Sequence, residues 1–328
     1  MNKSRGGIQR TQLFNDYSAN FTAVQRDLAG HNIQDTFLCP LCLKAFGRDA
    51  LEKPERLSVE HCIPGRVGGT LATATMTCTD CNNGMGSQLD AQWKRRAEVL
   101  GFLTGKSARP TDCVLTVGGI KVRGEWSLSI DGLPKSDITL DAKRSNPKDM
   151  QAVQAAMQKL LRDPENAKFT LSFPWFKERH SRVALLRMAF LMMFRQFGYS
   201  YILLPCMERV RRQILNPKDK TIPDAYIMQI DELRAANKVT VITAPTDHRS
   251  FMVILKFSTD GQTFCKGVIM PAPDDNQSTI YETLAEEQSQ KDKFTPTVSI
   301  LRYDPSWLSV ADCTSYLSTL WSEILQKQ

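Results

Sequence analysis

Apolar and polar residues follow two different patterns along the chain, and the change falls after about residue 104. Before it, apolar residues recur every three or four positions across residues 87–103. This spacing predicts a helix with an apolar stripe formed by Leu89, Trp93, Ala97 and Leu100. After it, residues 113–132 alternate apolar and polar side chains on both sides of Gly118-Gly119, the pattern of a β-hairpin. The sequence therefore predicts a helical end to a first region and a sheet at the start of a second.

Downstream of this hairpin, patterns of helices and strands are mixed. Asn146 and Pro147 suit the N-cap and first position of a helix that ends near Leu161. Residues 181–197 predict a strongly apolar helix broken at Gly198, and a basic helix follows over 205–215. A further helix is predicted around 278–290, and another from Ser309. Strands are predicted at 169–174, 225–230, 238–244, 250–257, 262–270 and 297–303.

Together these elements predict an α+β protein made of three regions. Residues 1–14 are polar and basic, and we expect them to be poorly ordered. Residues 15–30 are compatible with a short helix that stops at Gly30, so 1–36 form an N-terminal segment. Residues 37–104 form a small metal-binding module, and 105–328 form a larger α+β domain. This domain would serve in target recognition or in regulation of the module.

Composition narrows the class of protein only a little. The 328 residues include 42 Lys+Arg and 35 Asp+Glu, and the net charge of +7 is compatible with a polyanionic partner. The most apolar stretch, 183–194, is too short to span a bilayer and contains Arg187, so we expect no membrane span. The start of the chain lacks the apolar core of a secretory signal, and the nine cysteines include four in metal-type spacing. A reducing, cytoplasmic setting follows as an expectation.

Two Cys-x-x-Cys pairs are the most specific chemical signal in the sequence. Each pair presents two sulfurs to one ion, and four thiolates bind zinc tetrahedrally. The 35 residues between the pairs exceed the spacer of a simple zinc ribbon, so further structure is expected between them. The expected structural zinc ligands are Cys39, Cys42, Cys78 and Cys81.

Residues between and after these pairs add a second kind of metal chemistry. Glu60 and His61 are adjacent in a β-type segment, so their side chains point to opposite sides of a strand. Gly68-Gly69 predicts a turn, and Asn82-Asn83 directly follows the last cysteine. Oxygen donors beside a histidine suit a catalytic cation and a general base.

The order EHCIP, Gly-Gly and CTDCNNGMG, followed by Asp90, resembles the HNH endonuclease family, in its branch with a four-cysteine zinc. The resemblance covers Cys39 to about Asp90. It implies a ββα-metal fold that cleaves phosphodiester bonds with Mg²⁺ or Mn²⁺. His61 would be the general base, while Glu60 and Asn82 would bind the catalytic cation, with Asn83 as the rival of Asn82.

This chain differs from the family pattern at one position that often orients the histidine. The family often carries an Asn a few residues before the second cysteine pair, where this chain has Thr73, Thr75 and Thr77. The resemblance therefore leaves the orientation of His61 to these hydroxyls or to backbone carbonyls.

Two basic clusters are candidates for contact with phosphate groups. Lys94, Arg95 and Arg96 lie on the helix after the expected metal site, and Arg209, Arg211 and Arg212 lie on the later basic helix. Either cluster could instead be a solvated helix face.

The resulting hypothesis is a metal-dependent HNH endonuclease that cuts DNA, with family resemblance suggesting restriction or anti-phage defence. Two alternatives remain open: a zinc-dependent nucleic-acid-binding protein that does not cut, and an HNH nuclease that acts on RNA. A protein partner or a second copy of the chain could bind through the region 105–328.

Overall fold

The computed structural model divides into two compact units. The first unit takes residues from 1–93, 178–258 and 263–328, and the second takes 94–177 with 259–262. These units differ from the expected division near residue 104, because the chain after residue 177 packs with the metal module. The structure describes residues 5–29, 32–52, 56–70, 73–103, 110–129, 135–162, 169–173, 175–230, 237–259, 262–273, 275, 277–290 and 297–300.

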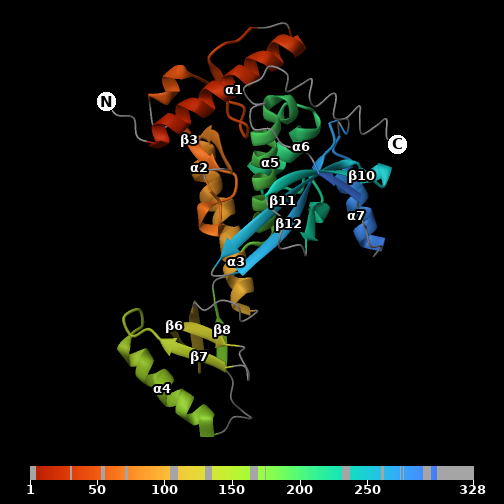
Figure 1. Cartoon of the computed structure of the whole chain (residues 1–328). Helices are drawn as coiled ribbons and strands as arrows, with labels where there is room; N and C mark the ends of the chain where they lie inside the picture. Colours follow the sequence, from red (N-terminus) through yellow and green to blue (C-terminus); the bar gives the residue numbers. More distant parts are fainter. Residues whose placement is uncertain are drawn as a thin grey trace. The chain divides into compact units, whose positions relative to one another are not determined.

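The first unit opens with a long helix, α1 (Arg5–Ala29), which begins earlier than expected (Figure 1). The expectation that residues 1–14 lack order is therefore wrong from Arg5 onward. Phe14 and Tyr17 are fully buried, and the Tyr17 ring stacks on Phe194 with centroids 4.3 Å apart. These aromatic anchors hold a helix that was predicted from residue 15 onward, and whose earlier turns were not predicted from their polar composition.

The metal module follows α1 as two small hairpins and a helix, in agreement with a ββα arrangement. β1 pairs with β2 and β3 pairs with β4, both antiparallel, and a continuous helical stretch follows β4. The elements are β1 (Thr36–Leu38), β2 (Ala45–Gly47), η1 (Arg48–Leu51), β3 (Leu57–His61), η2 (Gly65–Val67), β4 (Ala74–Cys78), α2 (Thr79–Met85), η4 (Gly86–Asp90) and α3 (Ala91–Leu103).

The central helix of the first unit is α5 (Glu178–Ile202), which confirms the apolar helix predicted over 181–197. The predicted break at Gly198 is also confirmed, since the helix is kinked there and the φ of 53° and ψ of −146° of this residue are not helical. A Cβ at Gly198 would lie 2.2 Å from Asn20 Oδ1, the atom that accepts a hydrogen bond from the Tyr199 amide at 2.8 Å. Glycine therefore lets α5 pack closely on α1 at this point.

A five-stranded sheet in the order β13-β10-β11-β12-β9 completes the first unit. All the predicted strands from 225 to 300 and the predicted helix near 278–290 are present. The strands are β9 (Ile227–Ile230), β10 (Lys238–Ala244), β11 (Ser250–Thr259), β12 (Gln262–Pro271) and β13 (Thr297–Ile300). The helices are α6 (Cys206–Leu215), η6 (Asp224–Tyr226), η7 (Thr246–His248) and α7 (Ile280–Gln290). The end of the predicted strand 297–303 and the helix predicted from Ser309 lie outside the described residues.

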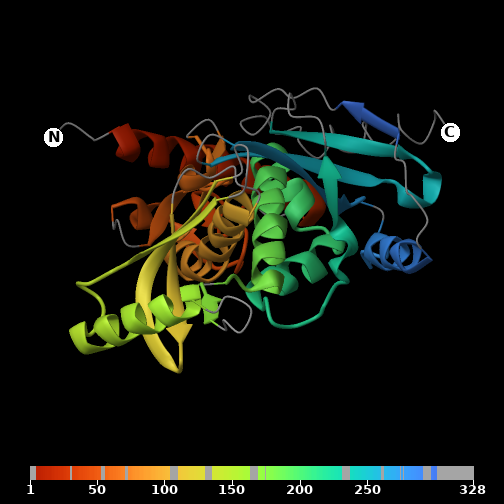
Figure 2. The same cartoon turned by 90° about the horizontal axis from the view of Figure 1, so that it is seen from below.

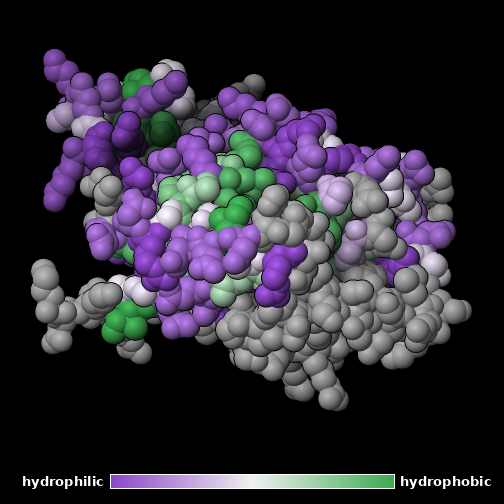
Figure 3. All heavy atoms as spheres, turned by 90° about the horizontal axis from the view of Figure 1, so that it is seen from above, coloured by the Kyte–Doolittle hydropathy of each residue, from purple (hydrophilic) through white to green (hydrophobic). Residues whose placement is uncertain are grey.

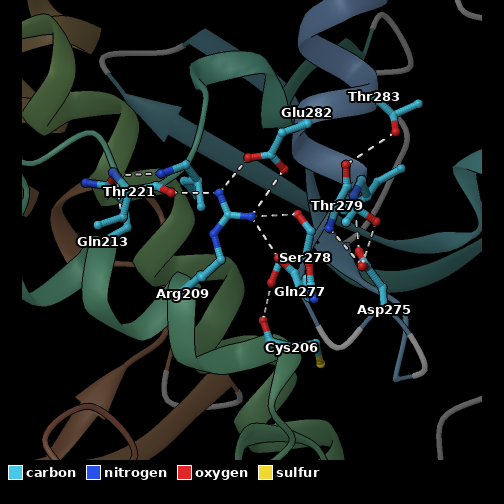
Figure 4. A network of polar contacts seen from close by, with 12 residues as sticks. Cys206, Arg209, Gln213, Thr221, Asp275, Gln277, Ser278, Thr279, Glu282 and Thr283 are labelled. Carbon is cyan, nitrogen blue, oxygen red and sulfur yellow. Dashed lines mark hydrogen bonds and ion pairs between the residues drawn. The ribbon is translucent and has the colours of Figure 1, made fainter.

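The second basic cluster is part of the fold of the first unit. Arg209 pairs with Glu282 of α7 at 2.6 Å and also donates to the carbonyl of Thr221 at 2.8 Å (Figure 4). Arg211 donates to the Ile202 carbonyl at 2.9 Å, and Arg212 pairs with Glu208 at 2.7 Å. The contacts of Arg209 and Arg211 tie α6 to its neighbours and favour the structural interpretation for these two residues, whereas the Arg212–Glu208 pair lies within α6.

The second unit is a four-stranded antiparallel sheet with one helix. The sheet order is β7-β6-β5-β8, from β5 (Thr111–Val117), β6 (Ile120–Ser129), β7 (Lys135–Leu140) and β8 (Phe169–Ser172). The predicted hairpin around Gly118-Gly119 is confirmed. Helix α4 (Pro147–Arg162) lies along the sheet, and Asn146 caps it by accepting from the Lys148 amide at 3.0 Å (Figure 2). The predicted α+β class is thus confirmed.

The face drawn in Figure 3 is mostly hydrophilic, with apolar residues gathered in small groups. Among the described helices, none is long and apolar enough to cross a membrane.

Candidate active site

Four cysteine sulfurs meet in the metal module, as their spacing predicted. The Sγ atoms of Cys39, Cys42, Cys78 and Cys81 all lie within 4.8 Å of one another. Cys42 Sγ and Cys78 Sγ are 3.7 Å apart. Zinc–sulfur bonds of about 2.3 Å give a tetrahedral edge of about 3.8 Å, so this donor set and spacing fit a structural zinc ion.

The local backbone explains how each pair reaches the cluster. Cys39 follows β1, and its amide and carbonyl bond to the Lys44 carbonyl and the Leu43 amide, closing a tight turn into β2. Leu43 takes the left-handed conformation in this turn, with a φ of 57°. Cys78 ends β4 and is the N-cap of α2, which places Cys81 in the first helical turn. Two different turn types therefore converge on one site.

The proximity of the thiols changes their acidity in opposite directions. Hydrogen bonding from Cys39 lowers the pKa of Cys78 to about 2 and that of Cys42 to about 7. The same contacts, first of all with Cys42, raise the pKa of Cys39 well above its usual range. The shifts of Cys78 and Cys42 favour the thiolate, which is the form that binds a metal ion, whereas those of Cys39 and Cys81 favour the thiol.

Glu60 and His61 lie at the end of β3 and face different surroundings. They stand opposite Thr75 and Ala74 of β4, respectively. Glu60 is buried, whereas His61 is half-buried. This difference agrees with the expectation that the two side chains point to opposite sides of the strand.

Gly68 and Gly69 determine the path of the loop that follows His61. Gly68 has a φ of 94°, which glycine adopts without strain. A Cβ on Gly69 would lie 1.6 Å from the carbonyl oxygen of Ile63, so a larger residue would displace this loop. The Gly69 amide also donates to the Pro64 carbonyl at 3.2 Å.

Asn82 and Asn83 are placed very differently on α2. Asn82 is half-buried, and its Nδ2 donates to Ser58 Oγ of β3 at 3.0 Å. Ser58 and Glu60 are two residues apart on β3 and share one face of the strand. Asn83 is exposed. The contact with Ser58 therefore brings Asn82, rather than its neighbour, to the face that carries Glu60.

A buried arginine that the sequence analysis did not assign to the site joins Glu60 to Asp90. Arg187 of α5 is fully buried, and its Nη2 lies 2.9 Å from Glu60 Oε1. Its Nη1 lies 3.1 Å and 3.0 Å from the two carboxylate oxygens of Asp90. The signal for this group was the single Arg within the apolar stretch 183–194, because a buried guanidinium needs a buried anion.

Burial dominates the electrostatics of this carboxylate pair. It raises the pKa of Glu60 and of Asp90, and the positive charge of Arg187 only partly opposes this effect. One guanidinium faces two carboxylates, so the ionised group has one net negative charge. Glu60 Oε2 is also buried without a hydrogen-bond partner among the described residues. An oxygen of this kind fits a ligand of a divalent cation.

Asp90 reaches Arg187 from an unusual helical turn. η4 is a single π-helical turn between α2 and α3, and Asp90 is its last residue. A π turn contains more residues than an α turn, so it rotates the side chains that follow it, and such turns occur often at functional sites.

Two of the three threonines that could have oriented His61 have other partners. Thr73 Oγ1 donates to the Thr70 carbonyl at 3.0 Å, and Thr75 Oγ1 lies 2.6 Å from the Tyr17 hydroxyl of α1. Thr77 Oγ1 is buried and has no partner among the described residues. These contacts place Thr73 and Thr75 in the support of the hairpin.

Lys94, Arg95 and Arg96 lie on α3 within the second unit. Lys94 and Arg95 both pair with Glu98, at 3.2 Å and 4.0 Å. The Arg96 guanidinium lies over the Phe176 ring, 5.2 Å from its centroid. Contact of this cluster with nucleic acid stays a prediction.

We expect Arg187→Met to lower the free energy of unfolding by about 3–5 kcal/mol at neutral pH, because it leaves two buried carboxylates without their counter-charge. Loss of the guanidinium should raise both carboxyl pKa values further. A carboxyl with a raised pKa in the folded state favours folding at low pH, and this contribution is lost as the pH rises through that value. The deficit relative to the wild type should therefore be smallest at low pH and grow as the pH rises.

Chemical denaturation at several pH values measures this effect. Arg212→Met is the matched control, because it removes an exposed pair on α6 and should cost only about 0.3–0.5 kcal/mol. Equal losses in the two variants, or a deficit independent of pH, would contradict the assigned role of Arg187.

The comparisons with known proteins agree with this geometry. Residues 39–98 match the family model described as HNH endonuclease. The matched segment begins at the first zinc-type cysteine and ends on α3. No curated protein and no solved structure gave a match.

Proposed function

We propose that this chain, in which residues 39–98 form a domain of the HNH endonuclease family, is a metal-dependent endonuclease that hydrolyses DNA phosphodiester bonds. The observation that carries the proposal is the arrangement around β3. His61 ends this strand, Glu60 is buried beside it, and Asn82 reaches the same strand from α2. A protein that only binds nucleic acid has no need of a base next to a cation site.

In this mechanism, His61 takes a proton from a water molecule as its oxygen attacks the phosphorus atom. The phosphorus–oxygen bond to the 3′ oxygen of the neighbouring nucleotide breaks, and that oxygen is protonated to a hydroxyl group. A half-buried imidazole at a strand end is accessible to the water molecule from which it would take the proton, as general base catalysis requires.

Glu60 Oε2 and Asn82 Oδ1 are the oxygens that would hold Mg²⁺ or Mn²⁺. The described surroundings fit this assignment, since Arg187 holds Oε1 of Glu60 and Ser58 holds Nδ2 of Asn82. Each contact fixes one side-chain atom and leaves the other oxygen directed away from it. When bound, the cation would offset the negative charge that builds up on the phosphate and the leaving oxygen.

The proposal also concerns the kind of nucleic acid that is cut and the biological role of the cutting. The net charge of +7 is compatible with DNA and equally with RNA, so both belong in the assay. The family resemblance adds restriction or anti-phage defence as the setting. Reduced phage plating on cells that express the wild type, and not on cells with an Asn82→Ala chain, would support this role.

The asparagine pair provides the sharpest test of the cation site. We expect Asn82→Ala to reduce plasmid cutting by at least about tenfold, and more Mg²⁺ or Mn²⁺ should partly restore it, because one ligand oxygen is lost. Asn83→Ala is the matched control on the next residue and should cut like the wild type.

Supercoiled plasmid and a structured RNA, each with Mg²⁺, Mn²⁺ or no added cation, provide the substrates for this assay. If only Asn83→Ala lost plasmid cutting, the cation ligand would be Asn83 and not Asn82. Cutting by the wild type that needs no divalent cation would contradict the proposed mechanism.

A further inference from the structure

The basic excess of the chain is concentrated in one unit. The second unit, residues 94–177 with 259–262, contains 15 Lys+Arg and ten Asp+Glu, a net charge of +5, whereas the whole chain has a net charge of +7. The remaining residues are therefore almost balanced. A polyanion should be attracted to the second unit more than to the first, independently of the proposed active site.

The same unit contains a continuous series of aromatic rings. Consecutive ring centroids lie 4.7, 5.5, 5.6 and 4.9 Å apart along Phe102, Trp126, Phe173, Trp175 and Phe176. The Trp126 Nε1 donates to Ser136 Oγ at 2.7 Å, so polar contact fixes the middle of the series. Aromatic pairs at these spacings support one another and form a rigid group.

Trp175 is the exposed member of this series. It is 58% exposed, whereas Phe102 and Phe176 are buried. The Trp175 ring stacks on Phe176 with an interplanar angle of 19°, and the Arg96 guanidinium lies over that same phenylalanine. A large ring is thus held by its aromatic neighbours and still presented to solvent, and Arg96 of α3 lies over the ring on which it stacks.

We infer that Trp175 and the neighbouring basic residues of α3 form a platform for single-stranded nucleic acid. A base would stack on the Trp175 ring, while Lys94, Arg95 and Arg96 would attract the phosphates. Unpaired bases fit this surface because a base inside a duplex keeps its faces stacked on its neighbours. The inference rests on the proposed function for its biological sense, but it concerns binding and not cutting.

Charge is the reason for choosing nucleic acid over a second copy of the chain as the occupant. A second copy would bring the same excess of positive charge to the platform, and like charges disfavour that contact. A single strand brings one negative charge per nucleotide together with an exposed aromatic face.

Binding of the full-length chain to fluorescein-labelled oligonucleotides, followed by fluorescence anisotropy without added Mg²⁺ or Mn²⁺, tests the platform. The probes are a single DNA strand of about 16 nucleotides, the same sequence as RNA, and the corresponding DNA duplex. We expect Trp175→Ala to weaken single-strand binding about 5- to 150-fold and duplex binding less. Trp175→Phe should retain most of the affinity because it keeps a ring.

Phe169→Ala is the matched control, since Phe169 is another exposed aromatic residue of the second unit, on β8. It should bind single strands like the wild type. Equal loss in Phe169→Ala, or unchanged binding in Trp175→Ala, would overturn the inference. It would also be overturned if Trp175→Ala abolished self-association of the chain and left binding unchanged, because the ring would then serve an interface between copies.

The outcome is separable from the fate of the proposed nuclease. Trp175-dependent binding by a chain that does not cut any substrate would support the platform and contradict the proposed nuclease function. Metal-dependent cutting by a chain whose binding does not depend on Trp175 would support the nuclease and rule out the platform. The relative affinities for the DNA and RNA strands would then show which single strand the platform prefers.

Discussion

His61→Ala is expected to lose plasmid cutting by about 10²–10⁴-fold or more while it keeps its zinc content and its melting temperature. The loss follows from the proposed role of the imidazole as the group that takes the proton of the attacking water. The fold should tolerate the change because His61 is half-buried at the end of β3 and stands opposite Ala74. It belongs neither to the four-cysteine cluster nor to the group held by Arg187.

A matched control separates this effect from the general cost of removing a histidine. His180→Ala removes a half-buried histidine of α5 and should cut like the wild type. Added imidazole should restore part of the cutting to His61→Ala, because it can supply a base near the space that the side chain leaves. Full activity in His61→Ala, or equal loss in the two variants, would rule out His61 as the base.

The sequence could predict the metal module because its chemistry depends on short-range patterns. Each cysteine pair forms within one tight turn, so spacing alone indicated that its sulfurs converge. Glu60 and His61 are adjacent, and the two-residue period of a strand placed them on opposite sides without further information. The predicted cap at Asn146 was confirmed for the same reason, since it concerns only the residues next to it.

Arg187 could not be assigned in this way because its partners are distant in the sequence. It lies 97 residues after Asp90, and its apolar helix showed only that it would be buried. The hydrophobic pattern of a sequence indicates which side chains are buried, but it does not identify the side chains that they contact. A buried charge restricts the possible neighbours to anions, yet the choice of Glu60 and Asp90 depends on how α5 packs on the metal module.

For the first residues of α1, the sequence predicted less order than the structure shows. Their polar and basic composition suggested disorder, which is a sound inference for an isolated segment. Phe14 and Tyr17 nevertheless bury their rings against the metal module and α5, with Phe37 and Phe194 among their partners. Tertiary packing of a few aromatic residues supplies the stability that composition did not indicate.

Cys78→Ser is expected to lose the structural zinc and to lower the melting temperature of the first unit strongly. Cys78 ends β4 and occupies the N-cap position of α2, so a zinc ion bound by Cys78 and Cys81 would connect the hairpin that carries Glu60 to the helix that carries Asn82. Structural zinc contributes about 10–16 kcal/mol in zinc-finger peptides, where folding depends on the metal. The loss here should be smaller, because the module also packs a hydrophobic core against α1 and α5.

Zinc content per chain and thermal unfolding measure this prediction, and a strong chelator applied to the wild type provides an independent route to the same state. Cys62→Ser is the matched control, since Cys62 is a fully buried cysteine of the same module outside the cluster. It should keep one zinc per chain even if it loses some stability. A Cys78→Ser chain that retains its zinc, or a chelated wild type that melts like the untreated protein, would show that the four sulfurs do not hold a structural metal. If both treatments remove zinc and lower the melting temperature, they should also lower plasmid cutting, because β3 and α2 would no longer keep Glu60, His61 and Asn82 together.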